Sequence, residues 1–208
     1  EIRFSRRRSR LLLFLPHDER MRGAAGWLIG LALCVAVTQV CGAGVEALTD
    51  GGEDLLKFAA EGDLEGVQEA LRGGADVNYA SEVGETPLHL SSIKHSMDVA
   101  KVLVDAGANV DLRTTGDRSL AMAPLHWFLF MNGCSEGVET LIGAGADVNA
   151  ICWSEDGSQL TPLDIAVKIS TRTHEQGLLR AAGAKLLEDM TQHELAKHAP
   201  PPGSAPPS

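Results

Sequence analysis

One short phrase returns along this chain at a nearly regular interval, and it constrains the fold more than any other feature. The phrase is Gly-Ala-Asp/Asn-Val-Asn/Asp, and a shortened Gly-Ala-Lys-Leu follows in the same rhythm. The copies begin at Gly74, Gly107, Gly145 and Gly183, so their spacings are 33, 38 and 38 residues. A fixed period of this kind indicates small stacked units rather than one thick core.

A second phrase keeps pace with the first, and its residue types predict the start of a helix. It stands as Thr86-Pro-Leu-His89, Ala123-Pro-Leu-His126 and Thr161-Pro-Leu-Asp164. Threonine is a favoured N-cap, and proline suits the first helical position, where no N–H is needed. A short apolar run follows each cap, and a second run at helical spacing ends at the glycine of the first phrase. Each unit is therefore predicted to be helix, turn, helix and glycine stop, followed by an extended polar connection. The helix-start positions are Thr86, Pro87, His89, Pro124, His126, Thr161 and Pro162.

The two phrases at this period resemble the ankyrin repeat family over about residues 52–188. The resemblance implies an all-α solenoid of three to four stacked helix-turn-helix units, caps included, with β-hairpin fingers in the connections. The first unit lacks the Thr-Pro-Leu-His phrase, and the last has the polar run Thr173-His-Glu-Gln176, so both ends are predicted to be caps. The unit bounds are about 52–80, 81–113, 114–151 and 152–188.

Some positions depart from the family pattern. Ala123 replaces a threonine N-cap, at a local cost of about 1 kcal/mol. Phe128 and Leu129 stand where the family has two alanines, so that junction must be splayed or repacked. The connections at 114–122 and 152–159 each have four extra residues, which predicts longer fingers.

The first part of the chain is predicted to lie outside the repeat domain. Residues 1–20 contain six arginines and no periodic apolar face, which favours a leader that is unstructured or not translated. Met21 then opens an uncharged stretch, and small residues follow its apolar centre at 41–43. We expect Met21 to be the start and residues 21–43 to be a signal peptide.

Other interpretations of this segment remain open. Residues 23–45 are long enough to form an uncleaved membrane anchor, which would be the chain's membrane contact. A transit segment or a mistranslated region is the remaining alternative. The expected location is accordingly the secretory pathway or a membrane if the Met21 segment directs it there, and otherwise the cytoplasm.

Charge and side-chain chemistry argue against several classes of function. The formal net charge is −10, and it becomes −14 for residues 44–208, so nucleic-acid binding is not expected. The chain has no phosphate-binding glycine loop and no converging catalytic set, which predicts a protein without catalysis, cofactor or metal.

The resemblance gives His89 and His126 a structural role as bridges between repeats, and the histidines at 174, 193 and 198 are expected at the surface. Cys134 and Cys152 are predicted to be at least ~12 Å apart, at opposite ends of the helices, and therefore free thiols.

What remains is a surface for binding. The family pattern implies a concave face built from finger residues and from the last residues of each first helix. Tryptophan, phenylalanine and methionine on such a face are common in binding hot spots, and acidic rims favour a basic protein partner. We therefore expect a monomeric interaction scaffold; the alternatives are a regulatory or targeting module of a larger enzyme or membrane protein, or aromatic residues that only fill the longer fingers. The predicted contact residues are Glu82, Val83, Glu85, Ile93, Lys94, Phe130, Met131, Trp153, Lys168 and Ile169.

The segment at 191–208 is predicted to be a short helix followed by a disordered, proline-rich tail. Thr191 and Glu194 fit a capping box, which places the helix start there. Residues 199–208 contain five prolines but no strict Pro-x-x-Pro, and Lys197 is the nearest basic residue. A ligand motif is therefore not expected in the tail.

The signal-peptide hypothesis predicts a mature chain that begins after residue 43. Edman sequencing or mass spectrometry of the chain isolated from expressing cells measures this directly. A mature chain beginning at Glu1 would contradict cleavage.

Overall fold

The computed structural model describes residues 51–94, 96–115, 120–131, 135–154 and 157–200. The described residues all belong to one compact unit of the chain. The predicted leader, the Met21 segment and tail residues 201–208 therefore lie outside the described part. Its elements are α2 (Gly52–Glu61), α3 (Leu64–Arg72), α4 (Pro87–Leu90), α5 (Met97–Asp105), α6 (Pro124–Phe130), α7 (Ser135–Gly143), β1 (Cys152–Trp153), β2 (Gln159–Leu160), α8 (Pro162–Lys168), α9 (Thr173–Ala181), a 3₁₀ turn (Leu187–Asp189) and α10 (Gln192–His198).

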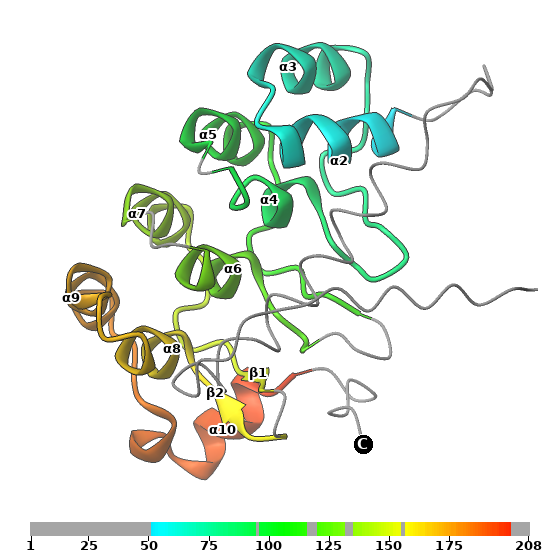
Figure 1. The fold of residues 1–208 in the computed structure, drawn as a ribbon. Coiled ribbons are helices and arrows are strands. Elements are labelled where there is room, and N and C mark those ends of the chain that lie inside the picture. The colour runs from blue at the N-terminus through cyan, green and yellow to red at the C-terminus, as the bar shows by residue number, and fades with distance from the viewer. Residues whose placement is uncertain (1–50, 95, 116–119, 132–134, 155–156, 201–208) are drawn as a thin grey trace, which may run out of the picture. The chain divides into compact units, whose positions relative to one another are not determined.

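Eight of these helices form two layers. Helices α2, α4, α6 and α8 make an inner layer, and α3, α5, α7 and α9 make an outer one (Figure 1). Each helix contacts its successor within the same layer, and the connecting loops extend from the stack beyond the inner layer (Figure 1). This arrangement confirms the predicted all-α solenoid of helix pairs.

The core lies between the two layers and repeats from unit to unit. Leu88, Leu125 and Leu163 follow the proline of each helix start, and at most 2% of each is exposed. Each leucine buried in this way stabilises the fold by about 1.5–3 kcal/mol. Because each helix pair is small, these side chains become buried only when neighbouring pairs stack.

The four glycines that follow the outer helices adopt the left-handed conformation. Their φ values are +91° at Gly74, +90° at Gly107, +87° at Gly145 and +87° at Gly183. A side chain with a Cβ is strained in this region, whereas glycine enters it freely. The chain can therefore leave each outer helix and turn towards the next finger.

The expectation of β-hairpin fingers was too broad. Within the described residues only β1 and β2 form a ladder, which is antiparallel and pairs Cys152 with Leu160 and Trp153 with Gln159. The connection before α4 is a tight turn instead, in which the Ser81 N–H donates to the Glu85 carbonyl over 2.9 Å. A turn this short leaves no room for a ladder.

Neighbouring fingers are joined through their backbones. The Thr115 N–H donates to the Val83 carbonyl over 2.8 Å. The Trp153 N–H donates to the Leu120 carbonyl, also over 2.8 Å. The connections therefore form a continuous edge along the stack instead of independent loops.

The large side chain at Phe128 is accommodated by a glycine on the facing helix. Phe128 is 1% exposed, and a Cβ added to Gly137 of α7 would lie 2.2 Å from its ring. The first unit uses the same device, because a Cβ on Gly66 would lie 2.6 Å from the ring of Phe58. The junction is thus repacked, because the large ring of the inner layer occupies the space that a glycine of the outer layer leaves. The sequence had left open whether the junction would be splayed or repacked.

None of the helices in the described residues combines the length and the hydropathy that a membrane span requires. The predicted signal or anchor segment lies outside this part, so the finding does not bear on it.

The fit of Phe128 against Gly137 predicts whether each of two glycine substitutions raises or lowers the free energy of unfolding. Gly137→Ala is expected to lower the free energy of unfolding by about 1–3 kcal/mol, because the new methyl group meets the phenyl ring. Gly177→Ala is the matched control: Gly177 lies inside α9 with nothing within 4 Å of an added Cβ, so the substitution should stabilise by up to about 1 kcal/mol. Urea unfolding measures both. In a Phe128→Leu background the cost of Gly137→Ala should disappear, and a persisting cost would contradict the size match.

Candidate functional site

Polar side chains at the helix starts bond across to the next unit. The backbone N–H of Thr86 donates to His89 Nδ1 over 3.1 Å, and the Thr86 hydroxyl lies 2.8 Å from the same nitrogen. Because Nδ1 accepts, the ring proton belongs on Nε2. This Nε2 lies 3.1 Å from the Met122 carbonyl, to which it donates. His89 thus ties its own helix start to the connection of the following unit.

His126 repeats this arrangement one unit later. The Ala123 N–H donates to His126 Nδ1 over 3.0 Å, and Nε2 donates to the Ala150 carbonyl over 3.0 Å. Alanine has no hydroxyl to add to the cap, so the imidazole and the backbone form this helix start alone. The two histidines therefore hold the structural positions that the resemblance implies.

Asp164 takes the histidine's position in the last unit, but its carboxylate accepts hydrogen bonds on both sides. Its Oδ2 accepts from the Thr161 N–H at 2.9 Å, as the imidazole Nδ1 does in the other units. A carboxylate cannot donate to a carbonyl, so Oδ2 instead accepts from the Leu187 N–H at 3.1 Å. The Thr161 hydroxyl lies 2.9 Å from the Lys185 carbonyl and 2.8 Å from Asp164 Oδ2, so its one proton is available to either acceptor.

A second set of bridges was missed at the sequence level. The last side chain of each Gly-Ala-Asp-Val-Asn phrase accepts a backbone N–H from the next unit: Asn78 from Asn109 at 2.7 Å, Asp111 from Asp147 at 2.8 Å, and Asn149 from Lys185 at 2.8 Å. The sequence did contain a sign of this, since asparagine or aspartate ends three of the four phrases.

Burial gives both bridging histidines an unusual titration. Each is fully buried, and loss of solvation lowers the pKa of His89 and of His126 to about 4. Both imidazoles are therefore neutral near pH 7, and their nitrogens are engaged with backbone groups. Within the described residues no three His, Cys, Asp or Glu side chains are grouped so that they could hold a metal ion.

Helix α10 packs back onto the stack, which the sequence did not indicate. The His198 carbonyl accepts from the Ile151 N–H at 3.0 Å and from an Arg113 guanidinium N–H at 3.1 Å. Arg113 also donates to the Ile151 carbonyl, and His198 Nδ1 lies 2.6 Å from Asp147 Oδ2. The expectation that His198 lies at the surface was wrong, because its side chain is only 13% exposed.

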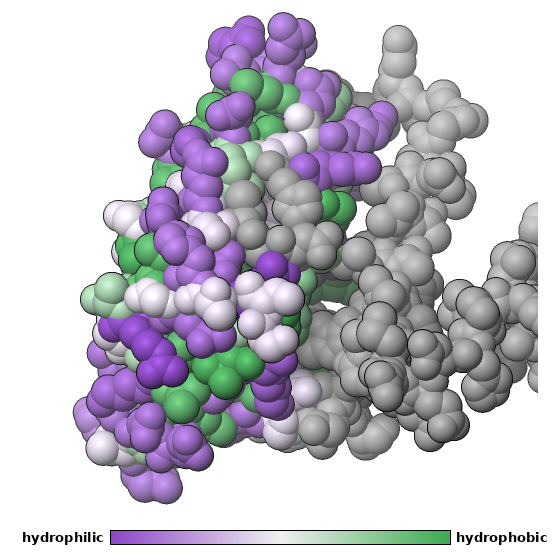
Figure 2. Space-filling model, turned by 60° about the vertical axis from the view of Figure 1, so that its left-hand side comes forward, coloured by the Kyte–Doolittle hydropathy of each residue, from purple (hydrophilic) through white to green (hydrophobic). Residues whose placement is uncertain are grey.

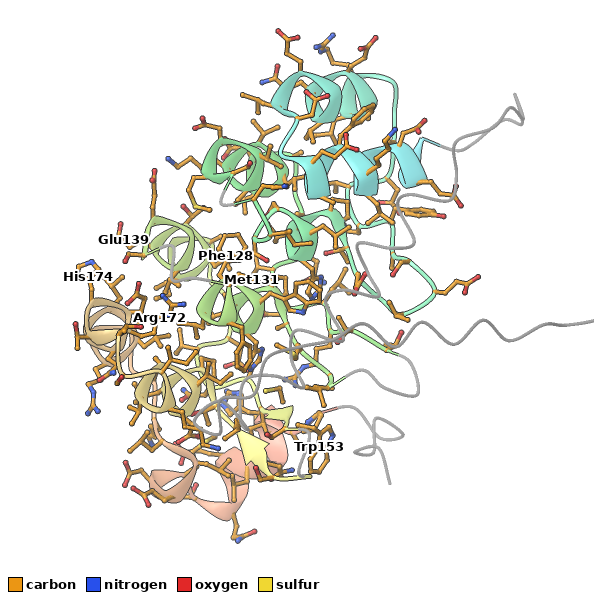
Figure 3. All side chains as sticks on the ribbon, in the orientation of Figure 1. Phe128, Met131, Glu139, Trp153, Arg172 and His174 are labelled. Atoms are coloured by element: carbon orange, nitrogen blue, oxygen red, sulfur yellow. The ribbon has the colours of Figure 1, made fainter. Side chains whose placement is uncertain are left out.

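The predicted contact residues fall into two groups by position. Glu82, Val83, Glu85 and Trp153 lie in the fingers, whereas the others end or follow inner helices. The exposed members are Glu82, Val83, Lys94 and Lys168, and the half-buried members are Glu85, Ile93, Phe130, Met131, Trp153 and Ile169. In Figure 3, Trp153 lies on the finger side, and Glu139 and His174 lie at the outer helices.

The outer-helix side carries a different surface. Hydrophilic residues cover much of it, with smaller apolar areas between them (Figure 2). His174 Nε2 lies 3.7 Å from Glu139 Oε1, and Lys101 pairs with Glu136, so polar contacts join successive outer helices. Cys152, at the base of the last finger, is a free thiol; its burial raises the thiol pKa to about 12 and makes it unreactive. Cys134 lies outside the described residues.

Comparison with known proteins agrees with this geometry. A family profile described as ankyrin repeats (3 copies) matches residues 55–152. Ankyrin repeat and SOCS box protein 16 of Homo sapiens is 36% identical over 85 residues, 41% of this chain and 18% of that protein. Serine/threonine-protein kinase 12 of Arabidopsis thaliana is 40% identical over 62 residues, 30% of this chain and 14% of the kinase. Palmitoyltransferase Hip14 of Drosophila melanogaster is 33% identical over 96 residues, 46% of this chain and 14% of that enzyme.

The chain contains ankyrin repeats. Repeats of this family serve protein–protein interaction and are generally non-catalytic. The matched segments cover less than a fifth of each of these relatives, so the likeness is one of repeat regions and not of whole proteins.

The buried histidines predict a loss of stability in mild acid. Their pKa is about 4 in the folded chain and near 6.5 when unfolded, so the unfolded state binds protons first as the pH falls. The free energy of unfolding should be constant above about pH 7 and should fall below pH 6.5 by about 1.4 kcal/mol per pH unit for each histidine.

Denaturant unfolding between pH 7 and pH 5 measures this slope. His126→Gln keeps an acceptor and a donor but cannot take up a proton in this range, so it should halve the slope. Adding His89→Gln to this variant should lower the slope further. Equal slopes in the wild type and in His126→Gln would contradict the assignment.

Proposed function

We propose that this ankyrin array is a non-catalytic scaffold that binds a partner protein through its fingers and the ends of its inner helices. One observation carries the proposal: Phe130, Met131 and Trp153 stay half-exposed on that side, whereas Phe128 is enclosed in the core. Burying the remaining surface of such side chains against a partner gives the strong local contacts typical of binding hot spots.

The polar chemistry of the stack also favours binding over catalysis. The histidines and the aspartate at the helix starts hold backbone groups, so the repeat phrases are occupied by structural bonds. The charge on residues 44–208 is −14, and Glu82 is exposed in a finger, which supports a basic partner. We propose a monomer, because stacking of the units uses the apolar area that a dimer would need.

A second proposal is that the array is a regulatory or targeting module of a larger enzyme or membrane protein. The names of the relatives favour it, since a kinase and palmitoyltransferases contain similar repeats. A transcript that encodes a catalytic or membrane domain contiguous with this chain would support this alternative. The location proposed is the secretory pathway or a membrane if residues 21–43 act as a signal or anchor, and otherwise the cytoplasm.

Paired substitutions test the proposed surface. Trp153→Ala with Phe130→Ala should reduce partner capture at least tenfold, because truncating hot-spot side chains costs about 2 kcal/mol or more each. Affinity capture and proximity labelling from cells, followed by mass spectrometry, identify partners that the wild type retains and the variant loses. Glu139→Ala with His174→Ala is the matched control on the outer helices and should retain the same partners.

The melting temperature of each variant separates binding from folding. The proposal expects the aromatic variant to melt within a few degrees of the wild type. Unfolding of the aromatic variant would instead favour the interpretation that these side chains fill the longer fingers. Undiminished capture by a folded aromatic variant would overturn the proposed surface.

A further inference from the structure

The strand β1 has a far edge, on the side away from β2. The backbone N–H groups of Ile151 and Trp153 lie on this edge, because residues two apart in an antiparallel ladder point their N–H groups to the same side. The Trp153 N–H donates to the Leu120 carbonyl, and the Ile151 N–H donates to the His198 carbonyl at the end of α10. Backbone donors on such an edge are a template for pairing with another chain, and here α10 occupies one of the two.

The bonds that hold α10 are polar and lie near its two ends. Near its C-terminus the His198 carbonyl also accepts from an Arg113 guanidinium N–H at 3.1 Å, and His198 Nδ1 lies 2.6 Å from Asp147 Oδ2. Near its N-terminus the Lys185 ammonium donates to Glu194 over 2.5 Å. The side chains of Lys185 and Glu194 are 44% and 30% exposed, so water competes with this pair and it contributes little.

Helix α10 adds little apolar packing to these bonds. None of its residues is buried, whereas each of the eight stacked helices contributes at least one buried residue. Its Leu195 is half-buried and lines an open hollow of about 410 Å³ together with Leu160 and Leu187. Segments with few buried apolar contacts open at a lower free energy than the whole fold. We therefore expect α10 to leave its place while the eight stacked helices stay folded.

Departure of α10 opens a binding position at the base of the Trp153 finger. It frees the Ile151 N–H and one Arg113 guanidinium N–H, the two donors that hold the His198 carbonyl. Two convergent donors suit a backbone carbonyl, which is the group that an extended segment presents when it adds to a strand edge. Ile151 lies two residues before Trp153, and Figure 1 shows α10 next to β1 and β2, so the position adjoins the proposed partner surface.

We propose that α10 is an autoinhibitory cover: it closes the far edge of β1 in cis, and an extended segment of the partner protein places a carbonyl there when α10 leaves. The inference rests on the proposed function and deepens it, because it names the kind of segment that binds at the Trp153 finger. The cover keeps the buried Ile151 N–H paired while no partner is bound. Binding is then a competition between α10 and the partner.

Exchange of the Ile151 amide hydrogen reports the opening of α10 directly. We would follow this amide in ¹⁵N–¹H spectra of the full chain in D₂O at pH 7, with two reference amides. The Trp153 N–H lies on the same edge but bonds Leu120, and the Ala146 N–H bonds the Leu141 carbonyl within the stack. The protection factor of the Ile151 amide should be at least tenfold below that of Ala146.

Two histidine substitutions in α10 form a matched pair. His198→Ala removes the contact with Asp147 but keeps the carbonyl that accepts from Ile151. It should therefore raise the exchange rate of the Ile151 amide at least fivefold, through a larger open population alone. His193→Ala makes the same change at an exposed position of the same helix and should leave that rate unchanged. Neither variant should alter the two reference amides.

Unchanged exchange of the Ile151 amide in His198→Ala overturns the proposal. Faster exchange at all three amides also overturns it, because α10 would then be part of the cooperative fold. Exchange at Ile151 that depends on protein concentration would assign a second copy as the occupant of the edge and would overturn closure in cis.

The exchange measurement needs no partner, so it stands apart from the test of the proposed function. If the proposal holds, His198→Ala should increase the capture of those partners that Trp153→Ala with Phe130→Ala loses, and His193→Ala should not. If the Ile151 amide opens but capture of these partners stays the same, the cover is overturned and the proposed function stands. If the paired aromatic variant loses no partner, the proposed function fails and the partner segment fails with it, whatever the exchange shows.

Discussion

The fold depends on polar side chains that cross from one repeat to the next. No helix pair is large enough to bury its own apolar face, so stability comes from stacking, and stacking brings backbone groups into a dry interface. His89 and His126 satisfy those groups by accepting an N–H with one nitrogen and donating to a carbonyl with the other. A neutral imidazole is the side chain that offers both functions in one rigid ring. The same bond that joins the units therefore makes their association sensitive to protonation.

Asp164 shows how this constraint can be met by different chemistry. The carboxylate keeps the acceptor role towards Thr161, but the partner in the following segment changes from a carbonyl to the Leu187 N–H. The Thr161 hydroxyl lies within reach of the Lys185 carbonyl, a type of group that the imidazole bonds elsewhere. The last junction is therefore satisfied without an imidazole. The last junction also connects to the capping segment that carries α10.

The binding hypothesis rests on the contrast between enclosed and half-exposed aromatic residues. Phe128 fills the space that Gly137 leaves, and its contribution is to packing. Trp153 stands in the one described ladder, at the point where the end of α10 is bonded to the stack. The binding surface and the C-terminal segment thus meet at one finger.

The sequence by itself determined the architecture. The period, the capped helix starts and the glycine stops are local features, and each acts within a few residues, so helix pairs and their stacking could be predicted from them. The role of His89 and His126 came from the family resemblance, and the bonds of both fit it. The sequence did not indicate that Phe128 packs against Gly137 or that Arg113 donates to the His198 carbonyl. It also did not indicate that the turn at Ser81–Glu85 lacks a ladder. Phe128 and Gly137 are 9 positions apart, and Arg113 and His198 are 85 apart, so these two features depend on neighbouring elements. Only tertiary structure decides them, because periodicity describes one element at a time, whereas packing is a property of two surfaces in contact.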